Sequence, residues 1–110
     1  MSAYYEVTME VDSAIAEEWV EYMRSEHIPE VMQSRVFSSC QFLRVIEPRI
    51  EGFECFRITY EAMNLSIIQE YRAEISPALQ RKHNERYGEY AKGSRREMIG
   101  EFGISFWEEV

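Results

Sequence analysis

One residue of this sequence stands out as a group that could move a proton near neutral pH. His27 lies in the segment EEWVEYMRSEHIPEVM, residues 17–32, between Glu26 and Glu30. Because Pro29 cannot continue a helix, we expect the preceding helix to end at His27. The helix dipole and the neighbouring carboxylates would favour the imidazolium and raise the pKa of His27. His27 is therefore the candidate general acid or base, and the alternative is a histidine that caps the last helix carbonyls.

Three further side chains could orient a ligand. Arg44 and Arg57 carry guanidinium groups, which bind a carboxylate through a fixed fork, and Tyr60 offers a hydroxyl group. We predict that they contact a small anionic or phenolic molecule in a cleft of a sheet. The second histidine, His83, lies in the polar stretch QRKHNER, so we expect it on the solvated surface.

The sequence lacks the patterns that are typical of covalent, phosphoryl or metal chemistry. It contains no nucleophile elbow, no glycine-rich phosphate loop and no cluster of metal ligands. We therefore expect neither a metal nor a cofactor. Cys40 and Cys55 are too few for a disulfide framework and lack the spacing of a zinc site, which predicts two free thiols in the core.

The composition is that of one small folded domain. The chain has 110 residues, of which 45% are hydrophobic, so we expect a single domain over residues 1–110. Twenty acidic against twelve basic residues give a net charge of −8, which argues against binding to nucleic acid or to an anionic membrane surface. The sequence has no apolar run of roughly 18 residues and no basic patch followed by an apolar stretch at its start, so we expect a cytoplasmic protein.

Hydrophobic periodicity predicts a strand, a helix and two more strands in the first half of the chain. Residues 3–11 alternate as a half-buried strand does. Asp12 or Ser13 then caps a helix whose apolar residues fall on one face. Residues 36–47 and 53–61 have the composition of strands, and the turn-forming residues between them predict a hairpin.

The second half adds a helix and a strand. Asn64 is a suitable cap for a helix that reaches Gly88, with an interruption at Ser76–Pro77. The remainder is a final strand, which Gly100 or Gly103 either bends or ends. The whole order predicts an α+β fold, the ferredoxin-like split βαβ (βαββαβ) sandwich, in which two helices cover one face of a four-stranded antiparallel sheet.

The predicted hairpin indicates which face of the sheet the helices leave bare. We expect Leu43 opposite Phe56 on the helix-covered face. The other face is then too apolar for water and too polar for a core, with Cys40, Phe42, Arg44, Ile46, Phe53, Cys55 and Arg57. A second copy packed face to face would cover it and enclose a cavity, which predicts a homodimer. In the alternative, the two arginines pair with glutamates at the rim.

Several segments resemble a bacterial domain family of unknown function. They are YYEVTMEV, EEWVEYMRSEHIPEVM, FLRV, ITY and ISPALQRKHNERYG, and they reach from the first strand to Gly88. The most specific part of the family pattern is W, M, HIP and V after a first strand, which this chain matches at Trp19, Met23, His27, Ile28, Pro29 and Val31. The resemblance implies a fold rather than an activity.

The implied fold is similar to the dimeric α+β barrel group. That group includes cofactor-free monooxygenases, haem-degrading enzymes and muconolactone isomerase-like proteins, and fold alone does not transfer their functions. From Arg95 onward the sequence departs from the family pattern, and it carries Phe106 and Trp107 near its end. A tail of this kind could be donated to a partner subunit.

Two functional hypotheses follow. The first is a small homodimeric domain that binds a small organic ligand or serves in assembly. The second is a cofactor-independent enzyme, similar to a monooxygenase or an isomerase, that acts on a small aromatic or lactone-like substrate. In that enzyme His27 would move a proton while Arg44 or Tyr60 stabilised the developing negative charge. A cavity that holds His27 near Arg44 or Tyr60 would favour the enzyme.

Overall fold

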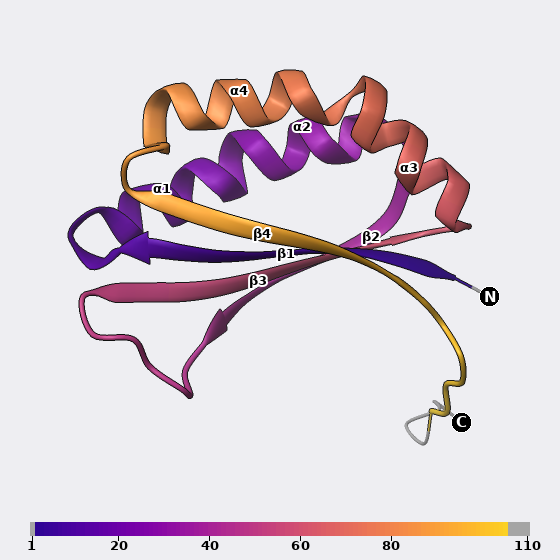
Figure 1. Ribbon diagram of the computed structural model, residues 1–110, viewed down its shortest axis with the longest axis horizontal. Helices are drawn as coiled ribbons and strands as arrows, with labels where there is room; N and C mark the ends of the chain where they lie inside the picture. Colours follow the sequence, from indigo (N-terminus) through magenta and orange to yellow (C-terminus); the bar gives the residue numbers. More distant parts are fainter. Residues whose placement is uncertain (1, 106–110) are drawn as a thin grey trace.

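The computed structural model describes residues 2–105, in which helices cover one face of an antiparallel sheet (Figure 1). A short 3-10 turn, η1 (Ser13–Ile15), joins the first strand to the first helix. The other elements follow the predicted order: β1 (Ala3–Asp12), α1 (Ala16–Tyr22), the π-helix η2 (Met23–His27), α2 (Ile28–Gln33), β2 (Phe37–Val45), β3 (Phe53–Ala62), α3 (Leu65–Glu74), α4 (Ser76–Tyr87) and β4 (Ala91–Ile99).

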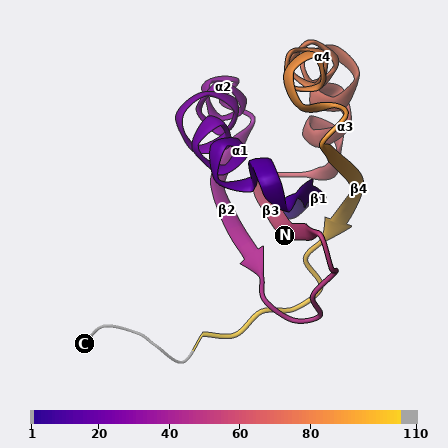
Figure 2. The ribbon, with the colours of Figure 1, turned by 90° about the vertical axis from the view of Figure 1, so that its left-hand side faces the viewer.

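The strands lie in the order β2-β3-β1-β4, and every neighbouring pair is antiparallel. The helical segment α1–η2–α2 and the segment α3–α4 lie side by side above the same face of the sheet, as the view along the strands shows (Figure 2). This arrangement confirms the predicted ferredoxin-like α+β fold.

The helix boundaries follow local sequence signals. The side chain of Asp12 accepts a hydrogen bond from the backbone N–H of Ala14 at 2.9 Å. Asn64 accepts one from the backbone N–H of Ile67 at 2.9 Å, as its predicted role as a cap requires. Both bonds satisfy donors that the first turn of a helix leaves without a partner. Pro77 stands in the first turn of α4, where its missing N–H costs nothing.

The pairing of β2 with β3 departs from the prediction by one residue. Phe37 pairs with Ala62, in the predicted register, but Ser39 rather than Ser38 pairs with Glu61. Ser38 is thus the extra residue of a β-bulge, and from there on the register is shifted. Because side chains alternate along a strand, this shift reverses the faces of the rest of β2.

Three residues assigned to the bare face therefore lie on the other one. Arg44, not Leu43, is opposite Phe56, so Cys40, Phe42 and Arg44 face the helices and the prediction for them was wrong. Phe42 packs against the ring of Trp19, with centroids 5.8 Å apart. Leu43 instead lies on the bare face, 46% exposed.

The core lies between the sheet and the helices and is rich in aromatic rings. Trp19 of α1 is fully buried against Phe56, with centroids 4.9 Å apart. Farther along the sheet, Phe37 lies 4.9 Å from both Tyr60 and Tyr71, measured between ring centroids. Rings of this size bury much apolar area, and these contacts tie both helical segments to the sheet.

The bare face of the sheet carries a buried carboxylate. Glu6, in the central strand β1, is only 2% exposed. Arg57 of β3 donates Nε to Glu6 Oε2 at 3.0 Å, and Arg96 of β4 donates Nε to Glu6 Oε1 at 2.9 Å. The two arginine side chains remain 51% and 62% exposed. We call these three residues the Glu6 cluster.

The last strand, β4, ends immediately before Gly100. β4 stops at Ile99, so Gly100 marks an end rather than a bulge, and its N–H donates to the carbonyl of Ser2 at 2.8 Å. Phe106 and Trp107, on which the idea of a donated tail rests, lie outside the described residues.

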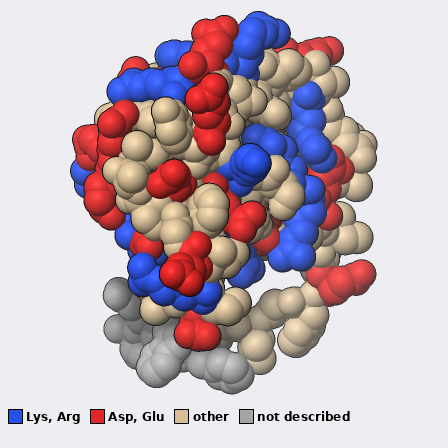
Figure 3. All heavy atoms as spheres, turned by 60° about the vertical axis from the view of Figure 1, so that its left-hand side comes forward, with Lys and Arg blue, Asp and Glu red and all other residues tan. Residues whose placement is uncertain are grey.

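Between residues 2 and 105, no helix has the length and apolar character needed to span a membrane. The surface in Figure 3 shows acidic and basic side chains interspersed.

Candidate functional site

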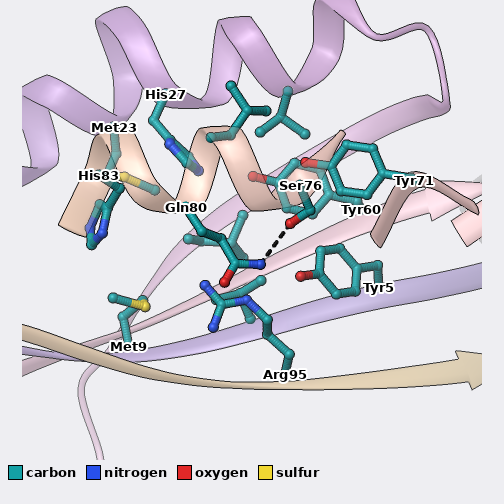
Figure 4. Close-up of a pocket in the computed structure, with 14 residues that line it drawn as sticks. Tyr5, Met9, Met23, His27, Tyr60, Tyr71, Ser76, Gln80, His83 and Arg95 are labelled. Atoms are coloured by element: carbon teal, nitrogen blue, oxygen red, sulfur yellow. Dashed lines mark hydrogen bonds between the residues drawn. The ribbon is translucent and has the colours of Figure 1, made fainter. Parts of the chain in front are cut away.

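A cavity lies between the helix-covered face of the sheet and the helices (Figure 4). The volume that the centre of a water-sized sphere can occupy in it is about 30 Å³, and the whole space between its atoms, including the part that is open to solvent, is about 450 Å³. Its apolar walls come from both layers: Val7, Met9, Met23, Val31, Ile58 and Leu79. Apolar walls with a few convergent polar groups are typical of sites for small molecules.

His27 lines this cavity from the helix above it, and its ring points inward (Figure 4). The helix does not end at His27, as the sequence predicted, but continues through the π-helix η2 into α2. The wider turn of η2 precedes Pro29, the first-turn proline of α2, so the chain passes the proline without a break. The helix therefore offers no last carbonyls for His27 to cap.

The ionisation of His27 also differs from the prediction. Burial, followed by the nearby His83, lowers the pKa of His27 to about 4, although Glu30 acts in the opposite direction. The predicted rise assumed a helix terminus in water, whereas the ring is mostly buried and faces the cavity. At pH 7 His27 is a neutral imidazole, which can accept a proton or a hydrogen bond.

His83 is buried rather than solvated. It is 6% exposed, and its Nε2 accepts a hydrogen bond from the indole N–H of Trp19 at 2.9 Å. Its Nδ1 therefore carries the proton and donates to Asn84 Oδ1 at 2.8 Å. Burial lowers the pKa of His83, so this ring is also neutral. The spacing of four residues from Leu79 to His83 and from His83 to Tyr87 could have placed it on the inner face of α4.

Three tyrosines direct their hydroxyl groups into the cavity (Figure 4). Tyr5 comes from β1, Tyr60 from β3 and Tyr71 from α3. Burial raises the pKa of Tyr71 to about 12, and it raises the pKa of Tyr60 still further. Both groups stay protonated at neutral pH and can donate hydrogen bonds.

The remaining polar groups come from α4 and β4. Gln80 donates Nε2 to the hydroxyl of Ser76 at 2.7 Å, and both side chains line the cavity. Arg95 of β4 reaches up into the cavity from the sheet (Figure 4). A surface hollow between α4 and β4 shares Met9, His83 and Arg95 with the cavity, and Gly93 also lines it. The cavity therefore approaches solvent on this side.

The structure brings together two of the four site residues that the sequence proposed. His27 and Tyr60 line the same cavity. Arg44 lies elsewhere on the helix-covered side, where it donates to Glu17 at 2.9 Å and to Glu54 at 3.0 Å. Arg57 belongs to the Glu6 cluster on the bare face. The proposed ligand contacts of the two arginines stay predictions, and neither residue lines this cavity.

Neither His83 nor Arg95 was predicted to lie in the cavity. Arg95 was recognised only as the point where the family pattern ends, because its face depends on the register of β4 against β1. Val7 is opposite Arg95, so the guanidinium side chain lies on the same face as the cavity. Among residues 2–105, no three His, Cys, Asp or Glu side chains gather as a metal site would require.

Solved structures with the same fold are numerous and diverse. A dimeric ferredoxin-like protein from an uncultured marine organism aligns with a TM-score of 0.74 at 12% identity, over 94% of this chain and 98% of that one. A variant of SnoaB, a cofactor-independent oxygenase from Streptomyces nogalater, aligns with a TM-score of 0.67 at 12% identity, over 94% and 96%. A variant of MhuD with two manganese protoporphyrin IX molecules bound per active site aligns with a TM-score of 0.64 at 17% identity, over 94% and 99%. At such identities the likeness shows the fold alone.

The sequence itself relates the chain to uncharacterised proteins. No curated protein sequence matches it. The predicted resemblance to a family of unknown function is confirmed, and it extends beyond Gly88 into the end of β4. Residues 2–100 match the family described as domain of unknown function (DUF4286), and the chain belongs to that family.

Proposed function

We propose that this protein binds a small organic molecule in the cavity between the sheet and the helices. The observation that carries the proposal is the set of polar groups on otherwise aliphatic walls. A core built for stability alone is close-packed and avoids polar groups without partners. Here a neutral imidazole, tyrosine hydroxyls and a guanidinium converge on one space.

A thermal-shift screen of ring-sized organic compounds tests this proposal. A compound that binds only the folded state raises the melting temperature as its concentration rises, and at 100 times its Kd it adds about 2.7 kcal/mol to the free energy of unfolding. We expect some compounds of the screen to behave in this way.

Two variants locate the binding. Leu79→Trp fills the cavity from α4, whereas Leu65→Trp adds the same ring at a partly buried position of α3 that does not line the cavity. We expect the stabilisation to disappear in Leu79→Trp and to persist in Leu65→Trp, with circular dichroism confirming that both variants fold. A screen without any stabilising compound, or equal stabilisation of both variants, would contradict the proposal.

A cofactor-independent enzyme is the second candidate, and the neutral state of His27 favours it. An imidazole that is unprotonated at pH 7 can take a proton from an acidic C–H group of a bound aromatic or lactone-like molecule. The Tyr60 hydroxyl, on the same cavity, would then donate to the oxygen on which negative charge develops.

Hydrogen exchange distinguishes the enzyme from a binding protein. Compounds from the screen with an acidic C–H group are incubated in D₂O with the protein, and the loss of that proton signal is followed by NMR. Catalysed exchange that disappears in His27→Gln, while binding persists, supports the enzyme. Binding without exchange supports the first proposal alone.

We also propose a homodimer in which two sheets meet through their bare faces. Leu43 and Phe53 lie on this face and are partly exposed in one chain. The Glu6 cluster spans β3, β1 and β4 on the same face, and its carboxylate is already shielded from water. Sedimentation should show a species of twice the 13.1 kDa chain mass at micromolar concentration. A lone monomer would contradict this proposal.

The cytoplasm is the location that we propose, with no role for nucleic acid. Cys40 and Cys55 are both free thiols, and they lie on opposite faces of the sheet. Burial raises the pKa of Cys40 to about 11, so its thiol is unreactive at neutral pH. Unpaired thiols of this kind suit a reducing compartment, and the net charge of −8 disfavours phosphate backbones.

A further inference from the structure

The polar groups of the cavity differ in charge from the molecule that holds them. The chain has a net charge of −8. Yet the residues that line the cavity include no aspartate, glutamate or lysine, and they include one arginine, Arg95. The cavity is therefore a positive site within an acidic protein.

Arg95 also differs from the arginines around it. Arg96, the next residue of β4, donates to Glu6, and Arg72 of α3 donates to Glu97 at 2.5 Å. In the part of the chain that the structure describes, Arg95 forms no such ion pair. Arg95 is partly exposed and lines both the cavity and the adjoining surface hollow, so its guanidinium can donate charge-assisted hydrogen bonds to an anion that enters from solvent.

The charge of Arg95 extends across the cavity. It contributes, after burial and other groups, to the lowered pKa of His27 on the opposite wall and of His83 on α4. It also opposes the rise in the pKa of Tyr60. Arg95 thus favours negative charge at several points of the same space.

Hydrogen-bond donors surround this charge. The hydroxyls of Tyr5 and Tyr60 enter the cavity opposite His27, and the Arg95 guanidinium approaches from below (Figure 4). Buried, fixed donors of this kind stabilise an oxyanion more strongly than water does. The aliphatic walls formed by Val31, Ile58 and Leu79 suit the apolar body that would carry such an oxygen.

We propose that the ligand of this cavity is a small organic anion, a carboxylate or phenolate on a ring-sized apolar body, whose charged oxygen binds Arg95. The proposal rests on the proposed function, because it names the class of molecule that the same cavity binds. The apolar body lies among the aliphatic walls, and the Tyr5 and Tyr60 hydroxyls donate to the anion.

Three probes of nearly equal shape test the charge. They are 2-naphthoate, the neutral 2-naphthamide and the cationic 2-naphthylmethylammonium, each titrated at pH 7 into the ¹⁵N- and methyl-labelled protein and followed by NMR. We expect 2-naphthoate to perturb the methyl signals of Val31, Ile58 and Leu79 and to bind at least about tenfold more tightly than the amide. The cation should bind most weakly.

Three variants assign the preference to Arg95. Arg95→Gln should reduce the preference for 2-naphthoate over 2-naphthamide to less than about threefold, and Arg95→Lys should retain most of it. Arg81→Gln removes the same charge from an exposed position of α4 outside the cavity and should leave the preference unchanged. Melting temperatures of the three variants show whether each is folded.

The outcomes separate the two proposals. If the amide binds in the cavity as tightly as the naphthoate, or if the preference for the anion survives in Arg95→Gln, the anion proposal is overturned and ligand binding stands. If none of the three probes perturbs a residue of the cavity, both proposals are overturned. If 2-naphthoate is preferred and this preference is lost only in Arg95→Gln, the result supports both ligand binding in the cavity and the anion proposal.

Discussion

At the scale of single residues, burial rather than sequence context decides how the ionisable groups behave. His27 has two glutamates as near neighbours in sequence, which would raise its pKa in an exposed helix. In the folded chain its ring leaves water, and that loss of hydration lowers the pKa to about 4. His83 shows the same effect in a stretch that consists almost entirely of polar residues.

The lowered pKa of His27 predicts a loss of stability in mild acid. The unfolded chain binds a proton at His27 near pH 6.5, whereas the folded chain does so only near pH 4. The contribution of His27 to the free energy of unfolding is therefore fully present above pH 6.5. It is lost as the pH falls toward 4. Between pH 7 and pH 5 the free energy of unfolding should fall by about 2 kcal/mol through His27 alone.

Urea unfolding of the wild type and of His27→Gln at both pH values measures this term. The variant should lose about 2 kcal/mol of the difference between pH 7 and pH 5. The remaining difference belongs to other groups, including His83, whose pKa is lowered in the same direction. An equal decline in both proteins would show that His27 is not the group that senses this pH range.

The sequence could identify some residues of the site and not others, for physical reasons. His27 and Tyr60 were recognisable from residue type and from the strand and helix patterns around them. Arg95 was not, because one arginine among ten reveals nothing until the register of β4 places its side chain over the cavity. His83 was misjudged because local polarity outweighed its helical spacing from Leu79 and Tyr87.

At the scale of elements, the order and type of the helices and strands were predictable from the sequence. The register of β2 against β3 was not. Alternation and caps at Asp12 and Asn64 determine where strands and helices begin. The bulge at Ser38 leaves no such local pattern, since serines occupy both 38 and 39. One unpaired residue nevertheless decides which of Phe42 and Leu43 enters the core.

Deletion of Ser38 should be tolerated. Without it, Ser39 follows Phe37 directly, so regular pairing with Glu61 and Ala62 continues and no side chain of β2 changes face. We expect the free energy of unfolding to change by less than about 1 kcal/mol. Denaturant unfolding, read out by tryptophan fluorescence, provides the measurement.

Deletion of Gln41 is the matched control for that experiment. It removes one residue after the bulge and turns Phe42 out of its contact with Trp19 and Phe56. We expect a loss of at least about 3 kcal/mol, comparable with the removal of a buried phenylalanine. Equal effects of the two deletions would show that the bulge does not set the register.

At the scale of the whole molecule, the bare face of the sheet is the surface that a single chain leaves without a covering layer. Helices cover the other face, and the Glu6 cluster neutralises only part of its own charge, with two guanidinium groups for one carboxylate. Between the exposed Leu43 and Phe53 this surface is partly apolar and partly charged. A partner with the same surface can bury the apolar portion.

A charge at Leu43 should therefore dissociate the proposed dimer. Leu43→Lys puts an ammonium group beside Arg57, its pairing partner on β3, and we expect the dimer Kd to rise about a hundredfold or more. Ile75→Lys, at a 37% exposed position between α3 and α4 on the helix-covered side, is the control and should remain dimeric. Sedimentation equilibrium gives both constants, and an unchanged Kd for Leu43→Lys would place the interface elsewhere.

The glycine at the edge of the cavity has a consequence for the timing of ligand exchange. A Cβ atom at Gly93 would lie 2.4 Å from the sulfur of Met9, so the absence of a side chain at Gly93 leaves room for the methionine side chain. Met9 has three rotatable bonds and no branch, and a side chain of this kind changes rotamer faster than a helix moves. The rate at which a bound molecule leaves the cavity would then depend on rotamer changes of the Met9 side chain rather than on separation of the helices from the sheet.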